Sequence, residues 1–549
     1  MTRHILVAVA WPYASGSRHL GHLAGAYLPP DIFARYHRLV GNQVLMVSGS
    51  DANGTPITVK ADELGITPKE VVDRYHPEFL GYWDRLGISF DLFTTTMTDN
   101  HHRVTQEFFL LLLENGYVAK GTSEQFYDPE AQRFLPDRYV EGTCPHCGYT
   151  DARGDQCDNC GRTLDPTDLL DPRSKLSGAT PERRETEHFF LDLPAFQEPL
   201  TEWLESKTTW RKHVRNWALG MVEDMPVRAI TRDIDWGVDI LVDDLGPGKK
   251  IYVWFDAVIG YLSASIEWAA STDDPEAWRK WWQDPAAESY YFVGKDNIPF
   301  HAVIWPAMLM GRGDLELPTD VPANQYLTFK GDKASASRGI GRSIAWYTDR
   351  LEPDALRYAI ASVFPEQNDT DFSDEEIIRR VNEELVATWG NLVNRVLSMS
   401  DANFEGTVPE PGELTDEDRA IVELGPATVD TVAGHIERTE LRAGLRAAMD
   451  AASEVNAYLN ATEPWKAIKQ DRERGGTILW SAVQAIAGIR VALYPYLPHT
   501  TATIGEMLGI GPELGSWSSP VVPGGTVLGT VAPVFLKLED DALLDEEDE

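Results

Sequence analysis

The segment that decides the fold is Ile5-Leu-Val-Ala-Val-Ala10-Trp-Pro-Tyr-Ala-Ser-Gly-Ser-Arg-His19-Leu-Gly-His22. Its first six residues are all apolar, which is typical of a strand buried on both faces of a sheet. A turn that contains proline and glycine follows, and a helix is expected to begin at about His19. A buried strand, a turn and a helix in this order indicate the first unit of a parallel α/β sheet.

The same pattern recurs further along the chain and predicts a sheet built from two separate parts of it. A second apolar strand is expected over residues 43–48, and it leads into Ser50-Asp51-Ala-Asn-Gly54. The pattern stops near Gly116 and returns at residues 251–254 and 290–294. We therefore expect a split α/β domain that carries an insertion, with ligands bound at the carboxyl ends of its strands.

All four cysteines of the chain lie in the expected insertion, as Cys144-Pro-His-Cys147 and Cys157-Asp-Asn-Cys160. Two such pairs present four thiolates to one tetrahedral centre, so the spacing predicts zinc. Two disulfides are the alternative, but they need an oxidising compartment, and no signal peptide is evident at the first residues. Four sulfur ligands leave no open position for a substrate, so the zinc is expected to be structural.

The length and charge of the chain limit its class. At roughly 150 residues per domain, 549 residues indicate three or four domains. The 86 acidic and 49 basic residues give a net charge of −37, which indicates either a solubilising surface or a halophilic protein that works at high salt. This charge argues against nucleic-acid binding unless a local basic patch outweighs it. No apolar run is long enough to suggest a membrane span, and residues 479–497 are expected to form a buried helix.

The C-terminal third is expected to be helical. Amphipathic periodicity predicts an all-α bundle, with helices over residues 375–400, 416–435, 438–460 and 476–497. The last forty residues are rich in glycine and proline and then acidic, and we expect the acidic end, residues 538–549, to be disordered.

Two short motifs carry chemistry. His19-Leu-Gly-His22 places two imidazoles at a helix start, where the dipole and free amides favour phosphate, although histidines there also serve as caps or surface residues. Far downstream, Lys330-Gly-Asp-Lys333-Ala-Ser-Ala-Ser-Arg338 combines small residues with cations. A loop of this kind suits phosphate binding, and an ordinary solvated basic loop is the alternative.

Together, HLGH after the first strand and a KxSxS loop after the sheet resemble the HIGH and KMSKS signatures of class I aminoacyl-tRNA synthetases. The resemblance narrows to the methionyl-tRNA synthetase family over about residues 4–510. It rests on the opening segment and on four further stretches: Phe134-Leu-Pro-Asp-Arg-Tyr-Val-Glu-Gly-Thr-Cys144, Glu187-His-Phe-Phe-Leu-Asp-Leu193, Tyr252-Val-Trp-Phe-Asp-Ala-Val-Ile-Gly-Tyr261 and Gly294-Lys-Asp-Asn-Ile-Pro-Phe-His301.

The resemblance implies a role for particular residues. ATP is expected to contact His19, His22, Asp296, Lys333 and Ala336, with His19, His22 and Lys333 in the catalytic set. Arg338 is added to that set for its nearness in sequence to Ala336, not by the resemblance. Asp51 is expected to hold the methionine ammonium. The walls of the methionine pocket are expected to be Ala10, Trp11, Tyr13, Trp254, Ala257, Tyr261 and His301. The tRNA anticodon is expected on Asn391, Arg395 and Trp465.

The implied activity is that of a methionine–tRNA ligase. Methionine and ATP, supplied with Mg²⁺, are expected to form methionyl-adenylate, and the methionyl group then passes to tRNA(Met). One structural Zn²⁺ per chain is expected at Cys144, Cys147, Cys157 and Cys160. The protein is expected to be a monomer, because the C-terminal tRNA-binding barrel that dimeric relatives often carry is not visible in the sequence. It is also expected to be cytoplasmic and not to contact a membrane.

The chain departs from the family pattern at the loop, which reads KASAS. Ala336 stands where the family has its second lysine, and Arg338 and Lys330 are the cations nearest to it. This loss keeps one alternative open, a weak or inactive paralogue that binds tRNA or methionine. A synthetase for leucine, isoleucine or valine is a further alternative, but residues 117–235 are short for its editing insertion.

The resemblance also sets the expected domain limits. The fold class is a split Rossmann-like class I synthetase domain with a zinc-knuckle insertion, followed by an all-α helical anticodon-binding bundle. The expected parts are the first catalytic half at 1–116, the insertion at 117–235, the second half at 236–320, the KMSKS-type and stem-contact region at 321–374, the bundle at 375–510 and the C-terminal extension at 511–549.

Overall fold

The computed structural model of the chain describes residues 2–162, 164–242, 245, 248–329, 332–333 and 342–544, without the side chains of residues 332 and 333. Within that part, the central feature is a five-stranded sheet in the order β14-β13-β1-β2-β3, and all its pairings are parallel. The strands are β1 (His4–Val9), β2 (Gln43–Ser50), β3 (Leu92–Thr95), β13 (Glu288–Gly294) and β14 (Ala323–Asn324). Two of them lie nearly two hundred residues after the other three, so the sheet is split as the sequence predicts.

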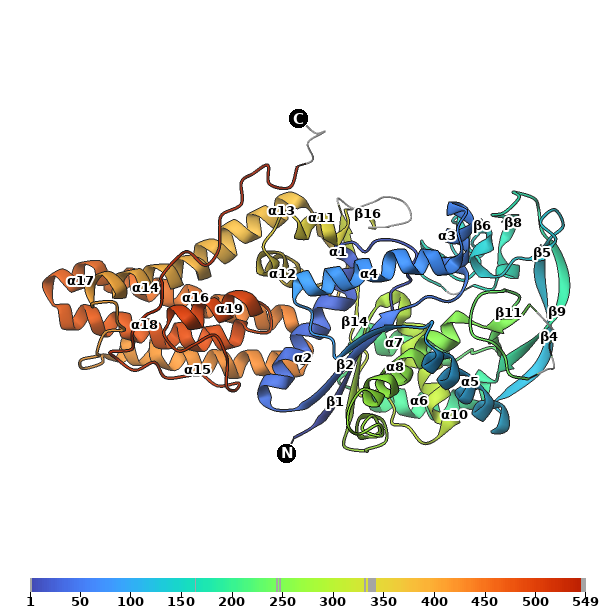
Figure 1. Cartoon of the computed structure of the whole chain (residues 1–549), viewed down its shortest axis with the longest axis horizontal. Coiled ribbons are helices and arrows are strands. Elements are labelled where there is room, and N and C mark those ends of the chain that lie inside the picture. The colour runs from blue at the N-terminus through green and yellow to red at the C-terminus, as the bar shows by residue number, and fades with distance from the viewer. Residues whose placement is uncertain are drawn as a thin grey trace.

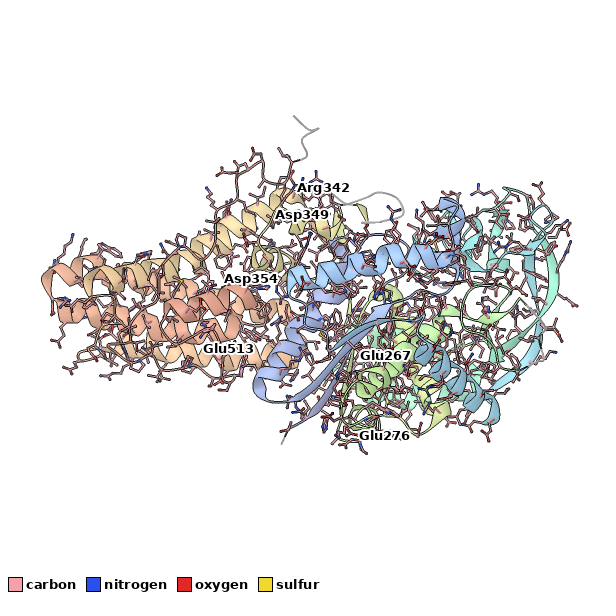
Figure 2. The ribbon with its side chains drawn as sticks, in the orientation of Figure 1. Glu267, Glu276, Arg342, Asp349, Asp354 and Glu513 are labelled. Carbon is pink, nitrogen blue, oxygen red and sulfur yellow. The ribbon has the colours of Figure 1, made fainter. Side chains whose placement is uncertain are left out.

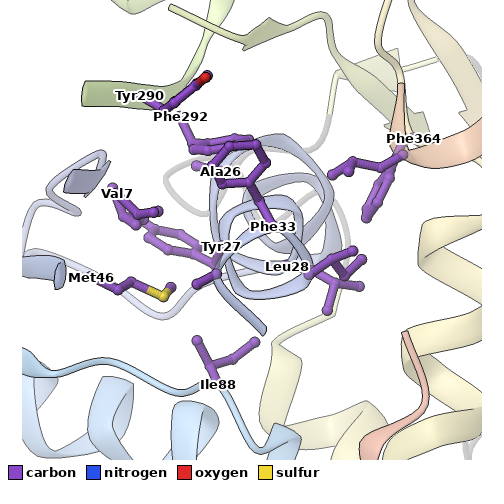
Figure 3. Packing of buried hydrophobic residues seen from close by; sticks show 14 of the residues in the cluster. Val7, Ala26, Tyr27, Leu28, Phe33, Met46, Ile88, Tyr290, Phe292 and Phe364 are labelled. Carbon is purple, nitrogen blue, oxygen red and sulfur yellow. The ribbon is translucent and has the colours of Figure 1, made fainter. Parts of the chain in front are cut away.

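The first helix lies directly on this sheet. It begins as α1 (Leu20–His22), continues as the π-helix η1 (Leu23–Tyr27) and ends as α2 (Leu28–Val40). Figure 3 shows this helix along its axis, with Val7, Met46, Tyr290 and Phe292 of three strands on one side and Phe364 on another. Burial of these apolar side chains fixes the helix start over the carboxyl end of β1.

Further helices complete the α/β body. α8 packs against β2, β3 and α5, and α10 packs against α5. The elements are α3 (Thr55–Leu64), α4 (Pro68–Leu86), α5 (Asp99–Glu114), α8 (Val253–Ala270), α9 (Arg279–Trp282), η6 (Phe300–Ile304) and α10 (Trp305–Arg312).

The apolar run at 251–254 corrects the sequence prediction. It does not join the central sheet, because only Ile251 is in a strand, β12 (Lys250–Ile251), which pairs with β11 (Thr231–Arg232). Helix α8 begins two residues later, at Val253. The apolar residues from Val253 onward belong to a buried helix. The prediction was wrong because a short apolar run does not distinguish a buried helix from a buried strand.

The insertion forms its own β-structure, on the right in Figure 1. Its main sheet, ordered β10-β9-β4-β5, is built on a long antiparallel pair. A smaller sheet, ordered β7-β6-β8, leads into the cysteine segment. The elements are β4 (Val118–Asp128), β5 (Arg133–Phe134), β6 (Val140–Thr143), β7 (Ala152–Arg153), β8 (Leu170–Ser174), β9 (Glu182–Leu191), β10 (Arg228–Ala229), α6 (Gln197–Ser206) and α7 (Lys212–Val222).

A small β-structure joins the α/β body to the bundle. Its sheet has the order β16-β15-β17, with β15 (Leu327–Phe329), β16 (Asp332–Lys333) and β17 (Thr370–Phe372). Helices α11 (Ile344–Thr348) and α12 (Pro353–Ala361) lie between β16 and β17 in the sequence. The domain limits given above stay a prediction.

The C-terminal third is helical, on the left in Figure 1. The helices are α13 (Asp374–Arg379), the π-helix η8 (Arg380–Gly390), α14 (Asn391–Asn403), α15 (Asp416–Glu437), α16 (Leu441–Thr462), α17 (Pro464–Gln470), α18 (Arg472–Leu493) and α19 (Pro498–Met507). α18 packs against α14, α15, α16, α17 and α19. It is the one helix in the described ranges long and apolar enough to span a membrane, and 94% of its most apolar window is buried inside the protein.

The acidic end is ordered further than the sequence predicts. The extension runs back along the bundle toward α13 (Figure 1). The amide side chain of Asn382 exchanges two hydrogen bonds of 2.8 Å with the backbone of Leu538. Leu543 is buried, and its carbonyl accepts a 2.8 Å hydrogen bond from Arg342. The expectation of disorder is therefore wrong for residues 538–544, because apolar residues within the acidic run find buried sites, and residues 545–549 lie outside the described part.

Candidate active site

A cavity of about 860 Å³ lies where β1 ends. Its lining comes from five parts of the chain: the turn and helix start after β1, residues 56–75 of α3 and α4, the cysteine-bearing insertion, Trp254 of α8, and residues between Gly294 and Ser343. This is the carboxyl edge of the parallel sheet, where ligands bind in α/β folds. The cavity therefore lies at the edge where the sequence predicts that ligands bind.

The two histidines of HLGH lie at the cavity in a fixed arrangement. His19 is the N-cap of α1, and its Nδ1 accepts a 3.1 Å hydrogen bond from the backbone amide of Gly21. In return, Nδ1 of His22 accepts from the amide of His19 at 3.3 Å. The ring centroids are 3.8 Å apart. Both histidines are therefore caps as well as cavity residues, so their capping role does not remove them from the predicted phosphate site.

Gly21, between the two histidines, has little room for a side chain. A Cβ atom there would lie 3.0 Å from the His19 ring and 3.4 Å from the carbonyl oxygen of Leu327. The absence of a side chain lets the helix start approach β15, the strand that leads into the KASAS segment.

The segment that follows KASAS returns to HLGH. Ser343 forms an antiparallel β-bridge with His19, and the amide of Ile344 donates a 2.8 Å hydrogen bond to the carbonyl of Arg18. Arg342, on the upper side of the molecule in Figure 2, lines the cavity. It also donates a 2.7 Å hydrogen bond to Asp374. The structure thus brings the residues that follow the KASAS segment to HLGH, although more than 300 residues separate them in the sequence.

The predicted loop residues are described only in part. Lys333 is in β16, where its backbone pairs with Thr328, but its side chain lies outside the described part of the chain. Lys330, Ala336 and Arg338 lie outside it altogether. Asp296 is in the 3₁₀ turn η5 (Lys295–Asn297), lines the cavity and accepts a hydrogen bond from the hydroxyl of Tyr326.

The predicted methionine pocket is a connected aromatic cluster. The rings of Trp11 and Tyr261 are 6.4 Å apart in a T-shape, and Tyr13 meets Trp254 at 6.1 Å in the same way. The hydroxyl of Tyr261 lies 2.7 Å from Nε2 of His301. Burial lowers the pKa of His301 to about 4, so this imidazole is neutral at physiological pH and suits an apolar ligand.

Trp11 has room only because two glycines face it. A Cβ atom at Gly49 of β2 would lie 2.3 Å from the indole, and one at Gly260 of α8 would lie 2.7 Å from it. The aromatic wall therefore depends on glycines that carry no functional motif of their own.

The predicted pocket residues divide into two groups. Ala10, Trp11, Tyr13 and Trp254 line the cavity. Asp51, Ala257, Tyr261 and His301 are buried behind that lining and are not among the lining residues in the described part of the chain. The backbone of Asp51 forms a β-bridge with Tyr13, and its amide donates a 2.8 Å hydrogen bond to the carbonyl of Pro12.

Cations in the cavity wall were missed by the sequence analysis. Besides Arg342, the wall includes Arg18, Lys60, Arg138, Arg153 and Lys175. Arg138 is paired with Asp155 at 3.0 Å and lies 5.2 Å from the ring of Tyr13. Arg18 and Arg138 both stand in stretches that carry the family resemblance, so a signal existed for these two. Lys60, Arg153 and Lys175 come from separate elements and share no pattern in the sequence.

The four cysteines fit one tetrahedral metal. Their sulfur atoms all lie within 4.8 Å of one another, with Cys147 and Cys157 at 3.6 Å and Cys144 and Cys160 at 4.0 Å. Four Zn–S bonds of about 2.3 Å in a tetrahedron place the sulfurs roughly 3.8 Å apart. A hydrogen bond from Asn159 lowers the pKa of the Cys147 thiol to about 6. The donor set therefore suits zinc.

The segment that carries the four cysteines, residues 144–160, also forms part of the cavity wall. Tyr149, Arg153, Gln156 and Asn159 lie within or beside the two cysteine pairs and line the cavity. Folding of the cysteine segment and the shape of the cavity are therefore linked.

The predicted anticodon residues gather far from this cavity, at the end of the bundle where α17 lies (Figure 1). The guanidinium of Arg395 lies 5.3 Å from the centroid of the Trp465 ring and donates a 3.3 Å hydrogen bond to Asn460. Asn391 is exposed one turn before Arg395 on α14. An exposed indole with amide and guanidinium groups beside it suits an unstacked base.

Comparisons with known proteins cover almost the whole chain. Residues 5–397 match the family model described as tRNA synthetases class I (M), and residues 408–546 match the anticodon binding domain of methionyl tRNA ligase. The chain is 50% identical to the methionine–tRNA ligase of Roseiflexus castenholzii over 99% of this chain and 98% of the relative. It is also 50% identical to that of Corynebacterium glutamicum, over 98% of this chain and 91% of the relative.

Solved structures agree. The methionyl-tRNA synthetase of Mycobacterium tuberculosis bound by methionyl-adenylate superposes with a TM-score of 0.80 and 26% identity, covering 98% of this chain and 100% of that one. The apo form of that synthetase gives a TM-score of 0.73 and covers 98% of each chain.

Proposed function

Since the chain belongs to the methionine–tRNA ligases of the class I tRNA synthetases, we propose how the residues of this cavity divide the work of that reaction. The enzyme activates methionine with ATP and transfers it to tRNA. None of the comparisons favours an inactive paralogue.

The reaction needs no covalent enzyme intermediate. A methionine carboxylate oxygen attacks the α-phosphorus of ATP, and pyrophosphate leaves. The terminal ribose hydroxyl of tRNA then attacks the carbonyl carbon, AMP leaves, and the hydroxyl proton is released. Catalysis therefore consists of positioning and of stabilising negative charge on phosphate oxygens.

ATP, supplied with Mg²⁺, lies on the HLGH side of the cavity. The observation that carries this assignment is the lining itself, which unites His19, His22, Asp296 and Arg342 in one space. Imidazole and guanidinium groups donate to phosphate oxygens, and each such donor contributes a factor of about 10² to 10³ when aimed at developing charge. The family resemblance adds Lys333 and Ala336 as expected ATP contacts and Arg338 as a candidate catalytic cation; Ala336, Arg338 and the side chain of Lys333 lie outside the described part of the chain.

Methionine lies on the aromatic side. The ammonium pairs with Asp51, and the thioether enters the cluster of Trp11, Tyr261 and His301, whose rings suit a polarizable sulfur. Ala10, Tyr13, Trp254 and Ala257 complete the pocket. Because four of the eight residues lie behind the cavity lining, binding requires the Trp11 and Trp254 rings to shift.

Two substitutions separate the two sides. Asp51→Asn should raise the KM for methionine by about tenfold or more in ATP–pyrophosphate exchange and leave the KM for ATP nearly unchanged. His22→Ala should lower kcat by about a hundredfold with little change in the KM for methionine. If both variants change the same parameter, the division of the cavity is wrong.

We assign one structural Zn²⁺ to Cys144, Cys147, Cys157 and Cys160, and it holds the cavity-lining segment folded. Metal analysis should find one zinc per chain. Removal by a chelator should raise the KM for ATP and leave the helical circular dichroism of the bundle intact. Zinc-free protein with full affinity for ATP would contradict this role.

Asn391, Arg395 and Trp465 read the anticodon of tRNA(Met). The protein works as a monomer that does not contact membrane, in the cytoplasm, where thiols such as these four remain reduced. A dimer mass in solution would contradict the monomer.

The charge of −37 fits a halophilic protein. Melting temperature and activity should then both rise as KCl is added. A fall in both would leave the solubilising surface as the explanation.

A further inference from the structure

Asp256 is a buried carboxyl group next to the predicted ammonium site. It lies in the first turn of α8, between the pocket residues Trp254 and Ala257, and has 0% exposure. Asp51, at the end of β2, is 2% exposed. Only Asp51 has a role in the proposed methionine pocket, so the second buried carboxyl group has none assigned.

Asn53 connects the two carboxyl groups. Its backbone amide donates to Oδ1 of Asp51 at 3.3 Å, and its side-chain amide donates to Oδ2 of Asp256 at 2.8 Å. The same side-chain amide lies 3.4 Å from the carbonyl oxygen of Thr96. Asn53 is itself buried, so the three residues form one polar cluster between β2 and α8.

The cluster has too few donors for two anions. Oδ1 of Asp256 is buried and has no hydrogen-bond partner among the described residues. A bare carboxylate oxygen in such a place is far more costly than a neutral carboxyl group. Two carboxylates that share a low-dielectric site resist double ionisation.

The charges around the cluster favour an anion at Asp51. Burial raises the pKa of both carboxyl groups, and the charge of Asp51 raises that of Asp256 further. The positive charge of Arg138 lowers the pKa of Asp51 but does not act on that of Asp256. A single proton is therefore held on Asp256 in preference to Asp51.

Other titratable groups near the cluster do not compete for this proton. Burial lowers the pKa of His101, on α5 facing α8, to about 3 and that of His301 to about 4, and it also lowers that of His102. Burial raises the pKa of Tyr13 and of Tyr261, so both phenols stay neutral. Near neutral pH, the exchangeable proton here belongs to the carboxyl pair.

We propose that Asp51 and Asp256 share one proton, held on Asp256, and that Asp256 is a positioning residue which keeps Asp51 as the single charge for the methionine ammonium. The neutral Asp256 still accepts a hydrogen bond from the side-chain amide of Asn53. This bond holds Asn53 in place, so that its backbone amide can donate to Asp51. This proposal rests on the proposed role of Asp51.

Methionine binding then shifts the shared proton. The arriving ammonium places a positive charge beside the pair, which lowers the pKa of Asp256. At a pH between the bound and free values, binding releases a fraction of a proton to the buffer. Asp256→Asn keeps the shape and the acceptor oxygen but has no proton to release.

Calorimetric titration with methionine in buffers of different ionisation enthalpy measures this release. Wild type should release a fraction of a proton that varies with pH, and Asp256→Asn should release none beyond the amino group of methionine, which titrates equally in both. Asp256→Ala, which removes the acceptor for Asn53, should bind methionine about tenfold more weakly than Asp256→Asn. Equal release by wild type and Asp256→Asn, no release by wild type, or equal affinity of the two variants would overturn the proposal.

An infrared spectrum of the free enzyme tests the proton without methionine. The difference between wild type and Asp256→Asn should contain the band of a protonated carboxyl group at neutral pH. A carboxylate band in its place would overturn the shared proton. Failure of the ammonium role is a separate result, namely unchanged methionine affinity in Asp51→Asn.

Discussion

The backbone of His19 is bridged to that of Ser343, so the first residue of HLGH holds the end of the segment that carries KASAS. The adjoining hydrogen bond, from the amide of Ile344 to the carbonyl of Arg18, is 2.8 Å long. The side of the cavity proposed for ATP is thus assembled by backbone contacts between two segments far apart in the sequence.

Ile344→Pro should weaken ATP binding by removing that amide donor. Ile344 is the first residue of α11, where proline fits a helix, and Ser343 before it is already extended, as a residue before proline must be. One lost hydrogen bond of about 1 kcal/mol predicts a rise of roughly fivefold in the KM for ATP, measured by pyrophosphate exchange.

Ile344→Ala is the control for this change, because it also removes the buried side chain but keeps the amide. An equal KM for ATP in the two variants would show that the hydrogen bond from the amide of Ile344 to the carbonyl of Arg18 does not contribute to ATP binding.

The missing lysine at Ala336 predicts a substitute cation. Arg338 and Lys330 are nearest in the sequence, and we expect Arg338→Ala or Lys330→Ala to lower the rate of pyrophosphate exchange by about 10² to 10³. Arg350, which lies outside the cavity lining and stacks on Trp346, supplies the control Arg350→Ala. Full activity in both loop variants would refute compensation by either residue.

Trp465→Ala should impair tRNA recognition without affecting methionine activation. Stacking of a base on an aromatic ring is worth about 1 to 3 kcal/mol, so the KM for tRNA should rise by roughly one to two orders of magnitude. Trp217 is a matched control on α7, with 38% exposure against 37% for Trp465. Equal effects of Trp217→Ala and Trp465→Ala on aminoacylation would argue against an anticodon site at α17.

The buried pair of Asp31 and Arg357 predicts acid sensitivity where the α/β body meets the bundle. Arg357 donates to Asp31 at 2.7 Å and to the carbonyl of Tyr496 at 2.8 Å. Burial alone would raise the pKa of Asp31, but Arg35 and Arg357 outweigh it and lower the value to about 2. The unfolded value is about 3.9, so the stability from this group is complete above pH 4 and is lost as the pH falls toward 2.

Asp31→Asn should therefore lower the urea denaturation midpoint at pH 7, because an unpaired buried guanidinium costs about 3 kcal/mol or more. It should also flatten the loss of stability between about pH 4 and 2. Asp73→Asn, which breaks the exposed pair with Lys69, should change little. An acid profile unchanged in Asp31→Asn would contradict the assignment.

The sequence predicts well where one local pattern decides the structure. The apolar run after Arg3, the two CxxC pairs and the helical periodicity after Asp374 each depend on neighbours in the chain, and the structure confirms the strand, the four-sulfur cluster and the bundle.

What the sequence did not predict depends on contacts between distant residues. Arg153 and Lys175 reach the cavity only because the insertion folds over it, and Gly49 matters because Trp11 and the backbone of Thr94 lie against it. The apolar spacing of residues 251–254 fits a strand as well as a helix start, and only packing against α5 decides for the helix.

The most direct test of the central claim is methionine-dependent ATP–pyrophosphate exchange by the purified protein, measured at low and at high salt. The cavity that unites HLGH, Asp296 and the aromatic cluster predicts exchange that requires methionine and falls sharply in Asp51→Asn and His22→Ala. No exchange at either salt concentration, with correctly folded protein that contains zinc, would contradict it.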